Sequence, residues 1–138
     1  MDKYKSSEES ERTFKRLFEQ TFHVELYKLI DYQKIDFSIC RDGTTIGFCE
    51  LKCRTIPFSK CDSIWISLNK FLTIKQIKRE LGLTTIFVNH FPDVGYRYYQ
   101  NWGDELDFDF AYRQTPQGDF EMNIRLPLAS FQVLKLDR

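Results

Sequence analysis

Residues 35–54 read IDFSICRDGTTIGFCELKCR, and this stretch decides the fold. Apolar and polar side chains alternate up to the dipeptide Asp42-Gly43, and a second run rich in apolar residues covers residues 46–52. Alternation of this kind is typical of half-buried strands, and Asp-Gly is a common tight turn between two of them. The stretch therefore predicts a β-hairpin.

The second strand of this hairpin carries two opposite charges on one face. Glu50 and Lys52 are two residues apart, so their side chains project from the same side of the strand. Leu51 points into the opposite layer. A carboxylate and an amine thus share one surface.

Whether Asp36 joins that surface depends on how the hairpin turns. If only Asp42 and Gly43 form the loop, Asp36 sits opposite Cys49 and faces away from Glu50. With a three-residue loop or a β-bulge, Asp36 falls opposite Glu50. A site that uses both acids therefore predicts one of these two irregularities.

Such a group of side chains suits one kind of chemistry. Two carboxylates held side by side repel each other unless a cation lies between them, and oxygen ligands with room for water favour Mg²⁺ or Mn²⁺. These ions lower the pKa of a bound water and bind phosphate oxygens, and Lys52 would orient or deprotonate that water. The set serves phosphodiester hydrolysis and has no obvious use in hydride or acyl transfer. An acid-x-Lys pattern alone, by contrast, is usually a solvated face.

The rest of the chain predicts elements around the hairpin. The expected elements are an amphipathic helix over about 10–21 after a frayed segment 1–8, an extended segment or strand at 24–30, a strand at 64–67, a helix over 69–81 that Gly82 ends, a second hairpin of 84–91 and 96–99, and short β or irregular cover at 108–112 and 120–133. This order predicts one α/β domain, residues 1–138, with a mixed sheet.

Composition narrows the class of protein. The chain has 138 residues, 42% hydrophobic and 29% charged, as in ordinary globular domains. No apolar run approaches the 18 or so residues of a spanning helix, and the polar start lacks a signal-peptide core, so we expect a cytoplasmic protein. The 20 basic and 20 acidic residues leave no net charge, so a polyanion would have to bind to a local basic patch. The candidates for nucleic-acid binding lie in the basic middle of the chain: Lys70, Arg54, Lys60 and Lys75.

The four cysteines, at positions 40, 49, 53 and 61, lack the tight pairs of a zinc site. Neither histidine, His23 or His90, is close enough in sequence to indicate a ligand or a base for a cysteine nucleophile. We expect reduced cysteines packed in or beside the core sheet.

Glu50-Leu51-Lys52 begins fourteen residues after Asp36, and this arrangement resembles the core motif of the PD-(D/E)XK nuclease superfamily. The superfamily includes Holliday-junction resolvases, many restriction enzymes and small phage-encoded endonucleases. The order of elements over about residues 8–91 is similar as well. Phage members look closest, in Glu50-Leu51-Lys52-Cys53-Arg54 and in Ser67-Leu68-Asn69-Lys70-Phe71. The resemblance implies a restriction-endonuclease-like core, a mixed central β-sheet flanked by helices.

The resemblance also implies roles for individual residues. Asp36 and Glu50, with the backbone carbonyl of Leu51, would hold Mg²⁺ or Mn²⁺, and Lys52 would assist the attacking water. Ile35 stands where the family motif has proline.

Many relatives add an acid from the first helix. The candidates here are Glu8, Glu9, Glu11 and Glu19. We favour Glu11, because it lies three and seven residues before Phe14 and Phe18 and so borders the packed face.

The function that the resemblance implies is a Mg²⁺-dependent DNA endonuclease acting on branched or structured DNA, in the cytoplasm of a host cell if a phage encodes it. A homodimer is implied because two cuts on opposed strands call for two sites, and the aromatic segment 96–102 could supply the contact. Two alternatives stay open: a catalytically weak nucleic-acid-binding module on the same fold, and a nuclease that acts on RNA or as an exonuclease.

Overall fold

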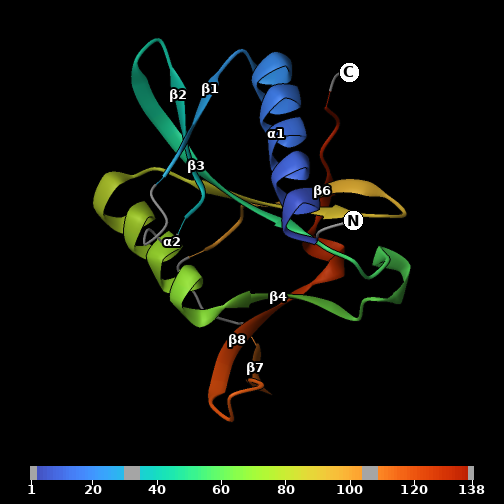
Figure 1. Ribbon diagram of the computed structural model, residues 1–138. Coiled ribbons are helices and arrows are strands. Elements are labelled where there is room, and N and C mark those ends of the chain that lie inside the picture. The colour runs from blue at the N-terminus through green and yellow to red at the C-terminus, as the bar shows by residue number, and fades with distance from the viewer. Residues whose placement is uncertain (1–2, 30–34, 104–108, 137–138) are drawn as a thin grey trace.

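The computed structural model describes residues 3–29, 35–103 and 109–136, which form two sheets and two α-helices (Figure 1). The elements are α1 (Lys3–Phe22), β1 (Glu25–Lys28), β2 (Phe37–Arg41), β3 (Thr44–Cys53), the 3-10 helix η1 (Phe58–Lys60), β4 (Ser63–Ser67), α2 (Leu68–Leu81), β5 (Thr85–Phe91), β6 (Gly95–Tyr99), β7 (Asp109–Gln114), β8 (Phe120–Pro127), the 3-10 helix η2 (Leu128–Ser130) and β9 (Gln132–Val133).

The larger sheet has six strands in the order β1-β2-β3-β5-β6-β9. It is mixed, because β3 and β5 run parallel while the other neighbouring pairs are antiparallel. Helix α1 covers one face with Phe14 and Phe18, and α2 covers the other with Phe71 and Ile74. The predicted restriction-endonuclease-like core, a mixed sheet flanked by helices, is confirmed.

The later part of the chain, expected as short β or irregular cover, forms a regular sheet with β4. Strands β4, β8 and β7 make a second, antiparallel sheet, in which Ile64 and Ile66 of β4 lie opposite Leu126 and Ile124 of β8. One face of this sheet closes the core under α2, and the β7–β8 hairpin projects from the body of the protein (Figure 1). Strand patterns predicted these segments but not their partner, because the paired residues are far apart in the sequence. Phe108, in the predicted segment 108–112, lies outside the described residues.

Helix ends follow local chemistry. Ser67 Oγ accepts a hydrogen bond from the Lys70 amide (3.3 Å) and caps the start of α2, and Gly82 (φ 69°) ends the helix as predicted. Helix α1 begins at Lys3, so the prediction that residues 3–8 are frayed is wrong. This segment contains neither Pro nor Gly and continues the helix toward the N-terminus. Residues 1–2 lie outside the described part.

The aromatic segment 96–102 is only partly exposed. Tyr99 and Trp102 are buried in the core under α2, and Tyr96 and Tyr98 pack against the α1 side while staying half-exposed. The expectation that this segment supplies a dimer contact stays a prediction. All four cysteines are free, with Cys40 and Cys49 buried, as the spacing predicted. Neither described helix is long and apolar enough to span a membrane.

The hairpin of β2 and β3 contains the irregularity that the site requires. Its loop has two residues, Asp42 (φ 51°) and Gly43 (φ 79°), and Cys40 pairs with Thr45. The register then shifts, so that Ile39 pairs with Gly47, Phe37 pairs with Cys49, and Ile46 is the extra residue of a β-bulge. The bulge brings Asp36, one residue before Phe37, level with Glu50.

Gly47 allows β3 to approach the start of β5 closely. A Cβ atom added at this position would lie 3.0 Å from the backbone oxygen of Thr84, which also accepts a hydrogen bond from the Phe48 amide (3.1 Å). We expect Gly47→Ala to lower the free energy of unfolding by about 1–3 kcal/mol, measured by urea denaturation, because backbone must move. Thr44→Ala, at an exposed position of the same strand, should change it by less than about 0.5 kcal/mol. Equal values for the two variants would contradict this account.

Candidate active site

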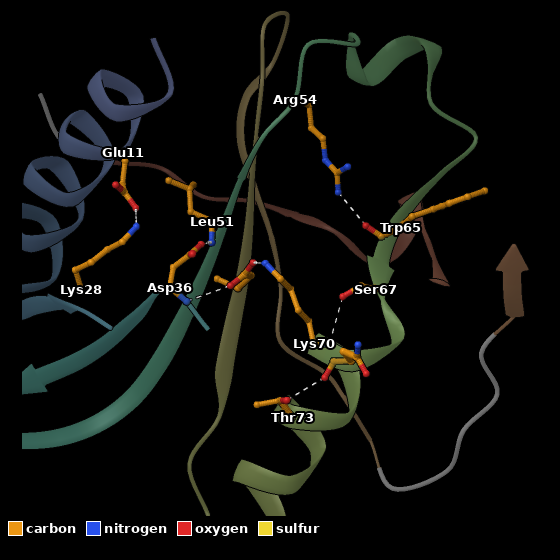
Figure 2. Close-up of polar contacts among 11 residues, drawn as sticks. Glu11, Lys28, Asp36, Leu51, Arg54, Trp65, Ser67, Lys70 and Thr73 are labelled. Atoms are coloured by element: carbon orange, nitrogen blue, oxygen red, sulfur yellow. Dashed lines mark hydrogen bonds and ion pairs between the residues drawn. The ribbon is translucent and has the colours of Figure 1, made fainter. Parts of the chain in front are cut away.

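Asp36, just before β2, and Glu50, on the central strand β3, lie side by side, and Figure 2 shows Asp36 next to Leu51 of β3. The Asp36 amide donates to Glu50 Oε1 over 3.1 Å, and the Leu51 amide donates to Asp36 Oδ2 over 2.9 Å. Glu50 is buried, with 1% of its surface exposed, whereas Asp36 is half-buried. The two carboxylates therefore form a closely spaced acid pair with one member open to solvent.

The acid pair disfavours a second negative charge. Burial raises the pKa of Glu50 to about 7, and the charge of Asp36 acts in the same direction. The ammonium group of Lys70 opposes this rise in pKa by an ion pair with Glu50 Oε2. Lys70 comes from the first turn of α2, which the Ser67 cap fixes next to the sheet. The acid pair is thus a place where a cation is stabilised.

Lys52 lies on the same face of β3 as Glu50, as strand alternation predicts. Desolvation lowers the pKa of Lys52, and the positive charges of Arg54 and Lys70 act in the same direction, while Glu50 opposes them. A lysine with a lowered pKa gives up a proton more readily at neutral pH. This property suits proton transfer beside the acid pair.

Arg54 extends the row of side chains beyond the end of β3. Its Nε donates to Asn89 Oδ1 (2.6 Å), and its Nη2 donates to the backbone oxygen of Trp65 (3.0 Å). Asn89 is fully buried on β5 opposite Lys52, and its Nδ2 has no hydrogen-bond partner within the described part of the chain. Arg54 therefore ties the central sheet to β4.

A comparison with protein-family models agrees with this geometry. A family described as "Phage putative PDDEXK endonuclease" matches residues 2–133. The chain belongs to this family. No curated protein and no solved structure gives a significant match. Membership places the phage PDDEXK chain among nucleases, which bind nucleic acid.

The structure brings together most of the residues that the sequence singled out. Asp36, Glu50 and Lys52 converge, and Lys70, predicted to bind nucleic acid, contacts the acid pair directly. Sequence reasoning missed that contact because it depends on how α2 packs on the sheet. It also missed Asn89, although a polar residue within the apolar run of β5 was a visible signal.

Other predicted residues lie elsewhere. Glu11 forms an ion pair with Lys28 of β1 and is not brought together with Asp36 and Glu50 (Figure 2). Lys60 lies exposed on η1, and Lys75 donates to the backbone oxygen of Trp102 (3.2 Å) at a basic cavity of about 770 Å³. In the described ranges neither lysine bonds to the acid pair.

The acid pair has the chemistry of a divalent-metal site. Among the residues that the structure describes, no three His, Cys, Asp or Glu side chains gather, so side chains supply two acidic ligands at most. Both are carboxylates, which suit a hard cation, and burial, together with the charge of Asp36, raises the pKa of Glu50 to about 7 even beside Lys70. Asp36 and Glu50 of the phage PDDEXK chain therefore fit such an ion.

Proposed function

We propose that this protein is a divalent-metal-dependent DNA endonuclease, with residues 1–138 forming one nuclease domain. Asp36, Glu50 and the Leu51 carbonyl would hold Mg²⁺ or Mn²⁺. The observation that supports this proposal most is the hydrogen bond of 3.1 Å from the Asp36 amide to Glu50 Oε1, because it fixes two carboxylates next to each other. Membership of a PDDEXK endonuclease family supports the same assignment.

The residues around the acid pair would share the chemical work. The ion, when bound, supplies a water of lowered pKa and neutralises charge on the phosphate. Desolvation is the main cause of the lowered pKa of Lys52, which accepts or directs the proton of the attacking water. Lys70, released from Glu50 when another cation neutralises that carboxylate, offers its ammonium group to a phosphate oxygen.

The substrate in this proposal is branched or structured DNA, cut by a homodimer in the cytoplasm of a host cell. Two opposed strands need two sites, and one chain carries one acid pair in its described part. Arg54 and Lys70 lie close enough to the pair to contact phosphates on either side of the cut, whereas Lys60 and Lys75 would contact DNA farther away.

Cleavage of a labelled four-way junction and a matched duplex, with Mg²⁺ or Mn²⁺, tests the proposal. We expect wild type to cut the junction faster, and Lys52→Ala and Asp36→Asn to lower the rate at least about 100-fold, because each removes a group that acts on the reacting atoms. Lys135→Ala, at an exposed position away from the acid pair, is the matched control and should cut normally.

Other outcomes would redirect the assignment. No cleavage, together with a thermal stability that Mg²⁺ leaves unchanged, would overturn the nuclease proposal in favour of a nucleic-acid-binding module. Cleavage of labelled RNA in place of DNA, or release of nucleotides from an end, would replace the DNA endonuclease by an RNA-directed nuclease or an exonuclease.

A further inference from the structure

The second sheet has two faces of different chemistry. Ile64, Ile66, Ile124 and Leu126 point into the core under α2. Residues at the alternate positions point away from that core, and they include Trp65 of β4 and Arg125 of β8. The outward face is therefore polar and partly aromatic.

Trp65 is held as an exposed flat side chain. It is 36% exposed, and its Nε1 donates to Ser63 Oγ over 3.0 Å. Arg125 lies directly opposite Trp65 across the β4–β8 pair, and its Nη2 donates to the backbone oxygen of Phe110 (3.2 Å). Trp65 and Arg125 thus occupy neighbouring positions on the outward face, with the guanidinium group held toward β7, and each side chain is fixed by a hydrogen bond.

Arg54 connects Trp65 to the strand that carries the acid pair. Glu50, Lys52 and Arg54 follow one another at alternate positions, and Arg54 donates to the backbone oxygen of Trp65. Figure 2 shows the Trp65 side chain extending from β4 away from Arg54 and Asp36. Arg54 thus holds β4 next to the strand that carries the acid pair, and Arg113 of the outward face is near enough for its charge to help lower the pKa of Lys52.

The charges on this outward face favour a polyanion only near the acid pair. On the hairpin itself, Glu121 pairs with Arg113 (2.6 Å), and Asp109 lies opposite Arg125. The two acids balance the two arginines, so phosphate attraction comes from Lys52 and Arg54, and Trp65 and Arg125 offer mainly flat surfaces.

The opposite face of the β7–β8 hairpin is a less suitable surface for nucleic acid. It exposes Phe110, Tyr112 and Phe120, but none of its strand positions in the described residues carries a cation. The two faces thus give a matched comparison within one hairpin.

We propose that Trp65 and Arg125 form a stacking surface for unpaired bases of the DNA strand whose phosphodiester lies at the acid pair. This inference rests on the proposed nuclease function and assigns the substrate a single-stranded region beside the cut. Bases in a duplex are already stacked, whereas unpaired bases present a free face to an indole or a guanidinium group.

Intrinsic fluorescence tests this contact directly. The chain has two tryptophans, and Trp102 is buried, so nucleic acid can reach only Trp65. In Glu50→Gln protein without metal, we expect an oligo-dT of about 12 nucleotides to quench Trp65 emission, and a blunt duplex of equal length to quench it far less. The same protein carrying Trp65→Phe should show no quenching beyond an inner-filter control.

Binding of a labelled oligo-dT gives the second measurement. We expect Trp65→Ala to weaken affinity about tenfold, and Arg125→Gln to weaken it with little change in the salt slope. Tyr112→Ala removes a ring of the opposite face that is more exposed than Trp65, 66% against 36%, and should leave affinity unchanged. Thermal melts check that each variant is folded.

The outcomes separate this inference from the proposed function. Quenching of Trp65 without cleavage by wild type would leave the stacking surface intact and overturn the nuclease. Normal cleavage with no quenching, or affinity lost in Tyr112→Ala and kept in Trp65→Ala, would overturn the stacking surface alone.

Discussion

Glu50→Gln is expected to abolish cleavage, by at least about 1,000-fold, and at the same time to make the metal-free protein more stable at pH 8, by about 3 kcal/mol. Gln keeps the acceptor for the Asp36 amide but removes the buried charge that Lys70 only partly neutralises. The same substitution should thus act in opposite directions on activity and on stability if this carboxylate holds the proposed ion.

The pH dependence of this effect has a definite sign. The pKa of Glu50 is about 7 in the folded protein, against 4.5 for an ordinary glutamate, because burial disfavours its charged form. The unfolded chain therefore loses this proton first as pH rises, and the stability that the protonated group provides is present below about pH 4.5 and is lost up to about pH 7. Above that pH the loss is complete.

Urea denaturation of wild type and Glu50→Gln in EDTA, from pH 4.5 to pH 8.5, measures this difference. The two proteins should be equally stable at the acid end and diverge toward neutral pH. Glu80→Gln, an exposed glutamate of α2, is the control and should follow wild type. A Glu50→Gln protein less stable than wild type at pH 8 would show that the ion pair with Lys70 outweighs the burial cost.

Deleting Ser38 is expected to abolish cleavage, whereas deleting Ile46 is expected to preserve it, although each deletion shortens the step from Asp36 to Glu50 by one residue. Ile46 is the unpaired residue of the bulge, so its loss gives a regular ladder in which Asp36 still lies opposite Glu50. Loss of Ser38 moves Asp36 along β2. It then lies opposite Cys49 on the wrong face or, if the bulge is lost, opposite Phe48.

Cleavage rates and thermal melts of both deletion variants distinguish register from length. We expect the Ile46 deletion to cut within about tenfold of wild type, and the Ser38 deletion to lose at least about 100-fold even where it melts cooperatively. Ile46→Thr, which keeps the bulge and shortens an exposed side chain, controls for the loss of apolar surface. Equal activity in the two deletions would contradict the register assignment.

Much of the fold could be predicted from the sequence because its signals are local. Strand alternation, the Asp42-Gly43 turn and the Gly82 stop each depend on neighbouring residues, and they gave β2, β3 and α2 nearly as they are. The bulge was predicted differently, from the requirement that Asp36 and Glu50 act together. The requirement that two acids share one face thus predicted an irregularity that strand propensities alone do not predict.

What could not be predicted depends on contacts between distant segments. The pairing of β4 with β8 made a second sheet from segments expected only as cover. The packing of α2 brings Lys70 to Glu50, and Glu11 forms its ion pair with Lys28 of β1. Trp65 is partly exposed because β4 buries only its alternate side chains.

The bulge at Ile46 also implies a parity rule for related chains. When two acids on paired strands must face each other and an even step separates them, as here, the hairpin needs an odd loop or one unpaired residue. An odd step is satisfied by a plain two-residue turn. A change of two residues in this hairpin therefore keeps both acids on one face, whereas a single insertion or deletion does so only if a bulge appears or disappears.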